Sequence, residues 1–187
     1  DNLLDSVIDD LIASLRSPAY HLTVRPHPEY VKRYGERMKA LQEKYRDVPG
    51  EELTFEVDFS SNRSIYSSDL LITDWSGIAY EFCFATKRPA VFINTKIKSE
   101  NPEWQAIGLE PVEITLRSQV GRALEKEEAI HVKETVADLL AHAEDYRVKL
   151  SEIKDRHLFS YGTGGSVGVT YLLNRLSEIQ KAKKSKK

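Results

Sequence analysis

Short apolar runs separated by longer amphipathic segments dominate the pattern of this chain. Leu70–Ile72 and Ala90–Asn94 are apolar almost throughout, which is typical of strands buried on both faces of a parallel sheet. Tyr20–Val24 is a further short strand candidate. Leu53–Asp58 alternates apolar with polar residues, so we expect a strand there near a sheet edge, with one face covered.

Helical spacing of apolar side chains marks the segments between these runs. The segment after Gly77 carries Ile78, Phe82 and Ala85 on one stripe, and Ser76 is a suitable N-cap for that helix. We also predict helices at 3–15, 30–45 and 64–67, a last short strand at 112–115, and helix throughout from residue 118 onwards.

The repeated alternation of strand and helix predicts an α/β fold with a doubly wound, Rossmann-like parallel sheet. At 187 residues the chain suits one domain, so we expect this domain to cover residues 1–180, with helices at its C-terminal end and a basic tail at 181–187. Sheets of this kind bind ligands outside the carboxyl ends of their strands.

Polar residues follow each predicted strand, and the topology would bring them to one rim of the sheet. They are Arg25 and His27 after the first strand, Asn62 and Arg63 after the second, Asp74 and Ser76 after the third, and Asn94 after the fourth. Such a convergence of polar side chains at the carboxyl ends of parallel strands indicates a ligand site.

The residue types at this rim favour an anionic ligand. Two prolines stiffen the backbone around His27, and the nearby Arg25 carries a guanidinium that is always charged and can donate two parallel hydrogen bonds. The alternative to an anion site is a rigid turn with a surface histidine. Ser76 and the amide of Gly77, at the start of a helix, suit a phosphate. Asp74 would bind a ribose hydroxyl, orient His27, or cap the helix.

Other common sites are absent from the sequence. It contains no Walker motif, dinucleotide-binding fingerprint, Gly-x-Ser-x-Gly elbow or cluster of residues at metal-ligand spacing. The glycine-rich segment 161–166 also opens a helix, where it would either cradle a phosphate or simply form a flexible helix entry. Cys83, the single cysteine, lies on an apolar helix face, which fits a core position and a reducing compartment.

Charge is distributed unevenly along the chain. The net charge is −2, and without the five lysines of residues 181–187 it is −7, so we expect no nucleic-acid partner. The tail would either bind anionic lipid or remain a solvated, disordered terminus. No apolar run is long enough to span a bilayer. We therefore expect a cytoplasmic location, peripheral to the inner face of the membrane if the tail binds lipid.

Three motifs resemble, in order and spacing, those of the CDP-glycerol glycerophosphotransferase family, the teichoic-acid primases and polymerases. That family carries a His-Pro motif, then Ser-Asp-x-Leu-Ile-Thr-Asp-Tyr-Ser-Ser-x-x-Phe-Asp, then Lys-Pro-x-x-Phe. The matching segments here are Arg25-Pro26-His27-Pro28, Ser68-Asp69-Leu70-Leu71-Ile72-Thr73-Asp74-Trp75-Ser76-Gly77-Ile78, and Lys87-Arg88-Pro89-Ala90-Val91-Phe92.

The resemblance implies one half of a B-type glycosyltransferase (GT-B) fold, the C-terminal half that binds the nucleotide donor. The only methionine is Met38, so we expect the chain to be a fragment of a longer protein and inactive as a transferase by itself. The implied reaction is attack of an acceptor hydroxyl on the β-phosphorus of CDP-glycerol, with release of CMP. The acceptor, a polyol phosphate or a lipid-linked molecule, would be bound by the missing half, which in the family also supplies a histidine base. No cofactor is expected, and dependence on a divalent metal is left open.

By motif position, the resemblance implies a role for each residue of the rim. His27 would contact the donor diphosphate and assist the departure of CMP, Ser76 and the following amides would hold phosphate, and Asp74 would order the loop. The remaining donor- or phosphate-binding residues would be Arg25, Asn62, Arg63, Thr73 and Gly77.

Three departures from the family pattern leave the donor open. Trp75 replaces a tyrosine, Gly77 replaces the second serine, and Tyr80-Glu81-Phe82 stands where the family has Phe-Asp-Phe. CDP-ribitol or a nucleotide sugar remains an alternative donor, the latter in a GT-B glycosyltransferase or an epimerase. A non-catalytic nucleotide-binding or interaction module is the alternative outside enzymes.

Overall fold

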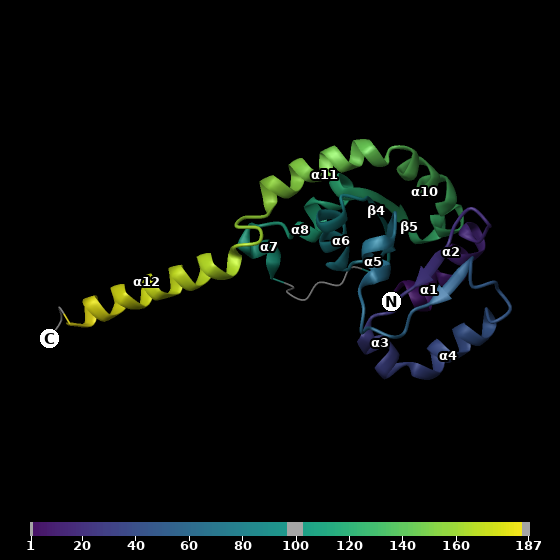
Figure 1. Cartoon of the computed structure of the whole chain (residues 1–187), viewed down its shortest axis with the longest axis horizontal. Coiled ribbons are helices and arrows are strands. Elements are labelled where there is room, and N and C mark those ends of the chain that lie inside the picture. The colour runs from purple at the N-terminus through teal and green to yellow at the C-terminus, as the bar shows by residue number, and fades with distance from the viewer. Residues whose placement is uncertain (1, 97–102, 185–187) are drawn as a thin grey trace. The chain divides into compact units, whose positions relative to one another are not determined.

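The computed structural model describes residues 2–96 and 103–184 (Figure 1). The chain divides into two compact units, Asp1–Leu150 and Ser151–Lys187. The first unit contains every strand, whereas the second is helical and consists of the end of α11 (Ala143–His157) and α12 (Gly164–Lys184). Among the described residues, none of the helices is both long and apolar enough to cross a bilayer.

All strands pair in parallel, in two sheets. β1 (Leu22–Val24) pairs with β2 (Leu53–Phe55), and β4 (Ala90–Asn94) lies between β3 (Leu71–Thr73) and β5 (Gly121–Glu125). The predicted α/β, Rossmann-like fold is therefore confirmed. β4 is the centre of its sheet, and the side chains of Ala90 to Ile93 are fully buried, as their unbroken apolar run predicts.

Helices connect the strands of the first unit and cover both faces of the larger sheet (Figure 1). They are α1 (Leu3–Ser6), α2 (Ile8–Leu15), α3 (Pro28–Arg33), α4 (Gly35–Lys44), α5 (Arg63–Ser67), α6 (Ile78–Thr86), α7 (Trp104–Ile107), α8 (Val112–Thr115), α9 (Arg117–Val120), the 3-10 helix η1 (Lys126–His131) and α10 (Val132–Ala141).

Alternate side chains of β4 enter two different layers of the core. Val91 and Ile93 pack with Leu11 of α2 and with Val132 and Leu139 of α10. On the other face, the ring of Phe92 lies 6.1 Å from that of Tyr80 in α6. Burying one such large apolar side chain stabilises the fold by about 1.5–3 kcal/mol, so β4 anchors both layers.

The β1–β2 pair shares this core with the larger sheet. Leu22 of β1 packs against the same buried cluster as Ile72 of β3. A second cluster, formed by Ile12, Val24 and Leu53, joins α2 to β1 and β2. The strands β1 and β3 therefore pack against one buried cluster.

Two predicted elements of the region 112–125 are wrong. Residues 121–125, predicted as helix, form the strand β5, and Val112–Thr115, predicted as a strand, forms the helix α8. Gly121 permits the strand because a Cβ there would lie 1.8 Å from the carbonyl oxygen of Ala90, so only glycine allows β5 to approach β4. The helix starts at Pro111, whose carbonyl accepts the amide of Ile114 at 2.9 Å.

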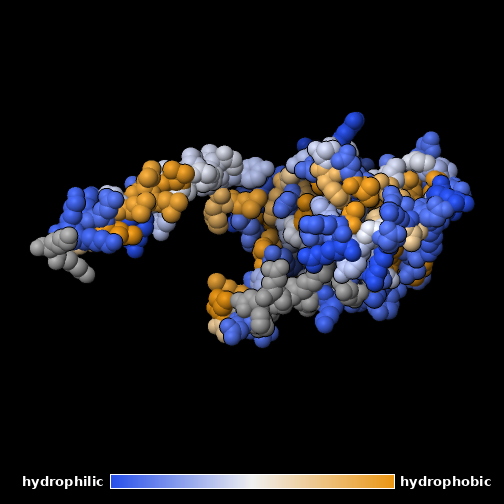
Figure 2. All heavy atoms as spheres, turned by 90° about the horizontal axis from the view of Figure 1, so that it is seen from below, coloured by the Kyte–Doolittle hydropathy of each residue, from blue (hydrophilic) through white to orange (hydrophobic). Residues whose placement is uncertain are grey.

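The second unit presents an amphipathic helix. Along α12 the exposed apolar residues recur at helical spacing and form an orange stripe in Figure 2: Val169, Leu172, Leu173, Leu176 and Ile179. The turn that precedes α12 contains two residues with left-handed backbone, Ser160 (φ 53°) and Gly162 (φ 77°).

Candidate functional site

The turn between β3 and α6 is the centre of the candidate site, and we call residues Asp74–Gly77 the β3–α6 turn. Thr73 and Asp74 are buried at its start, and Gly77 at its end is exposed. The predicted N-cap is wrong by one residue: Gly77 is the N-cap of α6, and no side chain caps the helix. The carbonyl of Ser76 instead accepts the amide of Ala79 at 3.3 Å, which tightens the first turn.

Three polar groups at the end of this turn and the start of α6 have no hydrogen-bond partner among the residues that the structure describes. Among the described residues, the Ser76 hydroxyl and the amides of Gly77 and Ile78 make no hydrogen bond. A Cβ added at Gly77 would meet nothing within 4 Å, so the space in front of these amides is open. Unpaired amides and the helix dipole both favour an anion at this position.

The indole of Trp75 points into the protein and not towards this open space. Its Nε1 donates a hydrogen bond to the carbonyl of Thr95 at 2.9 Å, and the guanidinium carbon of Arg117 lies 3.8 Å from its ring centroid. The aromatic residue of the motif therefore packs behind the turn. The Thr95 hydroxyl is buried and has no hydrogen-bond partner among the described residues.

Arg117 is a residue of the site that the sequence did not single out. It begins α9, and only 6% of its surface is exposed. Its Nη1 donates to the carbonyl of Asp74 at 3.3 Å and its Nη2 to Oδ1 of Asn94 at 2.6 Å. Burial lowers the pKa of Arg117, while the nearby Tyr80, Asp74 and Glu125 act in the opposite direction. The one signal in the sequence is an arginine inside an apolar helical pattern.

His27 lies at the end of β1, where it caps α3. Its Nδ1 accepts the amide of Glu29 at 3.1 Å, and Pro28 occupies the first position of the helix. A neutral imidazole with Nδ1 as the acceptor carries its proton on Nε2. Because the side chain is exposed, Nε2–H is free to donate to a ligand.

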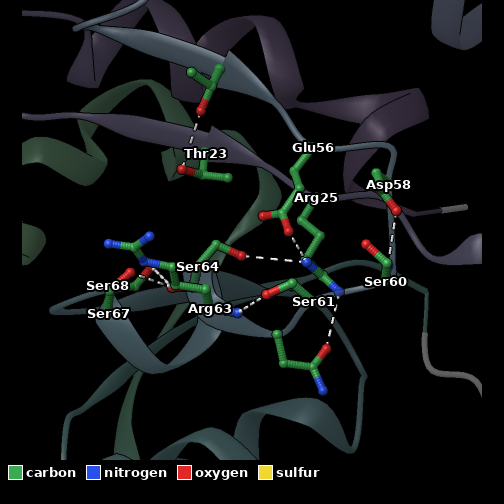
Figure 3. A network of polar contacts seen from close by, with 12 residues as sticks. Thr23, Arg25, Glu56, Asp58, Ser60, Ser61, Arg63, Ser64, Ser67 and Ser68 are labelled. Carbon is green, nitrogen blue, oxygen red and sulfur yellow. Dashed lines mark hydrogen bonds and ion pairs between the residues drawn. The ribbon is translucent and has the colours of Figure 1, made fainter.

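Arg25 is the hub of a polar network that joins β1, β2 and α5 (Figure 3). Its guanidinium pairs with Glu56, donates to Oδ1 of Asn62 at 3.1 Å and reaches Oγ of Ser64 at 3.4 Å. It also lies 5.5 Å from the ring centroid of Phe59. Glu56 neutralises much of the charge of Arg25. Arg25 therefore also has a structural role, because it links the ends of β1 and β2 to the start of α5.

Arg63 differs from Arg25 in having an unengaged side chain. It opens α5, where its backbone amide donates to Oγ of Ser61 at 3.1 Å, and its exposed guanidinium has no partner in the described parts of the chain. A free guanidinium can bind a phosphate through two parallel hydrogen bonds.

The structure thus brings the predicted residues together in two groups. Arg25, Asn62 and Arg63 form one around the start of α5. The other consists of Thr73, the last residue of β3, with Asp74, Ser76 and Gly77 of the β3–α6 turn. Within residues 2–96 and 103–184, no hydrogen bond or ion pair joins the His27 side chain to either group, and no cluster of residues is suited to hold a metal ion. The glycine-rich segment 161–166 lies in the other unit, where the hydroxyls of Thr163 and Ser166 bond to backbone carbonyls of that segment.

These features define a Rossmann-like α/β protein whose candidate site is an open helix N-terminus at the carboxyl end of the parallel strand β3. A model of the CDP-Glycerol:Poly(glycerophosphate) glycerophosphotransferase family matches residues 5–104, more than half of the chain. The chain belongs to this family, which confirms the resemblance found in the three motifs. Comparisons with curated proteins and with solved structures gave no significant match.

Proposed function

We propose that this chain is the donor-binding half of a transferase that moves glycerol phosphate from CDP-glycerol to a hydroxyl acceptor and releases CMP. Membership of the glycerophosphotransferase family supports a reaction of this type. The observation that carries the proposal is the β3–α6 turn, where the Ser76 hydroxyl and the amides of Gly77 and Ile78 have no hydrogen-bond partner in the described parts of the chain. The polymer made would be a teichoic acid or a related cell-surface polymer.

In this proposal, the β3–α6 turn binds the diphosphate of the donor. The amides at the start of α6 and the Ser76 hydroxyl are fixed before the substrate arrives, so they stabilise the charge that develops on the departing phosphate. His27 donates from Nε2 to a diphosphate oxygen. The free guanidinium of Arg63 binds a second anionic oxygen of the donor or lies beside its nucleotide.

The bond changes follow from the chemistry of the donor. The oxygen of the acceptor hydroxyl forms a bond to the β-phosphorus of CDP-glycerol, and the bond from that phosphorus to the bridging oxygen breaks with the electron pair going to CMP. The acceptor loses its proton to a base. We propose that this base and the acceptor site belong to the other half of a GT-B fold, so this chain alone would bind the donor without turning it over.

A titration of the protein with CDP, UDP, GDP and CDP-glycerol by isothermal calorimetry tests the proposed donor. We expect the cytidine nucleotides to bind more tightly than UDP and GDP. Ser76→Ala removes one hydrogen bond to phosphate and should weaken CDP binding by roughly tenfold. Ser67→Ala is the matched control, because that hydroxyl bonds to the carbonyl of Ser64 outside the turn. A preference for UDP would instead indicate a nucleotide-sugar transferase.

We also propose a location in the cytoplasm, at the inner face of the membrane. The apolar stripe of α12 and the lysines at its end, Lys181, Lys183 and Lys184, support this (Figure 2). Each lysine near an anionic membrane contributes about 1 kcal/mol. Co-sedimentation with vesicles that contain phosphatidylglycerol, but not with neutral vesicles, is the expected result, and equal binding to both would contradict the electrostatic part.

A further inference from the structure

Arg117 lies behind the β3–α6 turn and contacts its first two residues, Asp74 and Trp75. Its guanidinium bonds to the carbonyl of Asp74 at 3.3 Å and lies flat enough against Trp75 that its central carbon is 3.8 Å from the ring centroid. The same carbon lies 4.5 Å from the ring centroid of Phe92 in β4. The arginine is therefore enclosed between two aromatic rings at the carboxyl ends of neighbouring strands.

Further contacts fix each partner of Arg117 in place. Asn94 donates from Nδ2 to Glu125 at 2.8 Å, which turns its Oδ1 towards Arg117 at 2.6 Å. Trp75 is held at its far edge by the hydrogen bond to Thr95. Since the Asp74 carbonyl and the Trp75 ring are both held, the peptide that leads into Ser76 has little freedom to rotate.

Within the described residues, the charge of Arg117 is buried without a direct ion pair, although the carboxylates of Asp74 and Glu125 lie near enough to favour it. Among the described residues, no carboxylate oxygen comes within salt-bridge distance of its guanidinium, and its hydrogen bonds go to a backbone carbonyl and a neutral amide. A buried charge is costly unless an opposite charge offsets it. An anion bound at the open side of the β3–α6 turn would supply that opposite charge.

We propose that Arg117 is a positioning residue for the donor diphosphate. It holds the β3–α6 turn in the conformation that presents the Ser76 hydroxyl and the first amides of α6, and its buried charge raises the preference of the turn for an anion. The identity of the anion rests on the function proposed above, whereas the ordering of the turn does not. Arg117 lies outside the residues matched by the family model, so the match does not assign it this role.

Two substitutions of Arg117 separate the contacts from the charge. Arg117→Lys keeps a buried cation but loses the forked hydrogen bonds and the flat stack on Trp75. Arg117→Met removes the charge and keeps an apolar stem. Arg122→Met is the matched control, because Arg122 is exposed on β5 and pairs with Asp138 at 2.7 Å, away from the turn.

The first measurement is hydrogen exchange of the backbone amides of Ala79, Tyr80 and Glu81 in the unliganded protein, because these amides bond to the carbonyls of Ser76 and Gly77 in the turn. We expect faster exchange of these amides for Arg117→Lys and Arg117→Met, with the strands β3 and β4 still protected, and no change for Arg122→Met. Because Arg117→Lys retains the cation and most of the volume, it keeps the test valid if Arg117→Met does not fold. Unchanged exchange of these three amides in Arg117→Lys would overturn the proposal.

The second measurement is the affinity for CDP. We expect a loss of roughly tenfold for Arg117→Lys, because the turn is then less well ordered before CDP binds. The loss should be larger for Arg117→Met, because the positive charge behind the turn is removed as well. If the wild-type protein binds CDP and both variants bind it with the same affinity, Arg117 has no role in the site. If the wild-type protein binds no CDP, the proposed function fails, and the exchange measurement still decides whether Arg117 orders the turn.

Discussion

The two imidazole nitrogens of His27 have different roles. Nδ1 is occupied by the amide of Glu29, which fixes the ring at the start of α3. Nε2 is left as the donor, at the carboxyl end of β1 where ligands of α/β proteins bind. A side chain fixed in this way loses little conformational entropy when it binds a phosphate.

Replacing His27 therefore separates binding from stability. His27→Ala should weaken CDP binding by roughly tenfold, because one hydrogen bond to an anion is lost. The loss of the N-cap should cost about 1 kcal/mol, a change of a few degrees at most in the melting temperature. Calorimetric titration and thermal unfolding check the two effects.

His27→Asn is the variant that isolates the ligand contact, because asparagine is also a good N-cap. We expect the stability of the wild type with the weaker CDP binding of His27→Ala. His142→Ala serves as a control, since His142 is exposed at the end of α10 and bonds to Asp138. A large fall in stability with unchanged CDP affinity would make His27 a purely structural residue.

At the scale of elements, two glycines that border strands of the larger sheet have opposite roles. Gly121 starts β5 against the backbone of Ala90, where a Cβ would approach to 1.8 Å. Gly77 starts α6 with an ordinary helical φ of −60°, and open space surrounds the position of its missing Cβ. One glycine therefore serves packing, and the other leaves room in front of the free amides.

Alanine at these two positions should affect stability and binding in opposite ways. Gly121→Ala should destabilise the protein by about 1–3 kcal/mol or more, because the new methyl group would clash with the backbone carbonyl of Ala90 and displace β4. Gly77→Ala should leave stability nearly unchanged or slightly raised, but weaken CDP binding because its methyl group enters the space of the phosphate. Urea unfolding and calorimetry measure the two effects; full CDP affinity in Gly77→Ala would argue against a phosphate at this amide.

At the scale of the whole first unit, two tyrosine–aspartate pairs fasten the N-terminal helices to α3 and α4. The hydroxyl of Tyr30 in α3 donates to Asp5 at 2.7 Å. The hydroxyl of Tyr45, the residue that follows α4, donates to Asp9 at 2.6 Å. Burial, reinforced by the aspartate, raises the pKa of each tyrosine to about 12. Burial opposes ionisation of Asp5, but the bonds from Tyr30, Asn2 and Arg37 hold its pKa below the usual 3.8.

The stabilising effect of these pairs should depend on pH in a defined direction. A carboxyl group with a lowered folded pKa stabilises the protein fully above its unfolded pKa, and this stability is lost as the pH falls through the lower folded value. Tyr30→Phe should therefore cost about 1 kcal/mol at pH 7, a figure reduced for the partial exposure of the pair. The difference from wild type should shrink below pH 3.8, and urea unfolding at pH 7 and pH 3 measures it. A difference that stays constant over this range would show that packing of the ring, and not the charged hydrogen bond, stabilises the contact.

The sequence predicted the elements whose apolar residues are the ones buried in the structure. The apolar run of β4 could only be a buried strand, and the helical stripe after Gly77 could only be α6. It did not predict β5. Only the first residue of Gly121–Glu125 is buried, so apolar and polar residues do not alternate along this segment as they do in a strand with one buried face. The strand depends on the close approach of Gly121 to Ala90, which is a tertiary contact and leaves no local signal.

The same limit applies to the candidate site. Ser76, Gly77 and His27 could be selected because they follow predicted strands, and their roles as site residues stay predictions. The pairing of Arg25 with Glu56 joins residues 31 positions apart, and Arg117 reaches the Asp74 carbonyl across 43 positions. Neither contact can be read from a local pattern, so the sequence could not distinguish the paired Arg25 from the free Arg63 or point to Arg117.

The most direct test of the proposed donor site is a titration with CDP followed through the backbone amides of ¹⁵N-labelled protein by NMR. If the β3–α6 turn binds the diphosphate, the amide resonances of Gly77 and Ile78 should show the largest saturable shifts, and inorganic phosphate should move the same two resonances to a smaller extent. Saturable CDP binding that leaves the amides of residues 74–79 unperturbed would contradict a phosphate site at the start of α6.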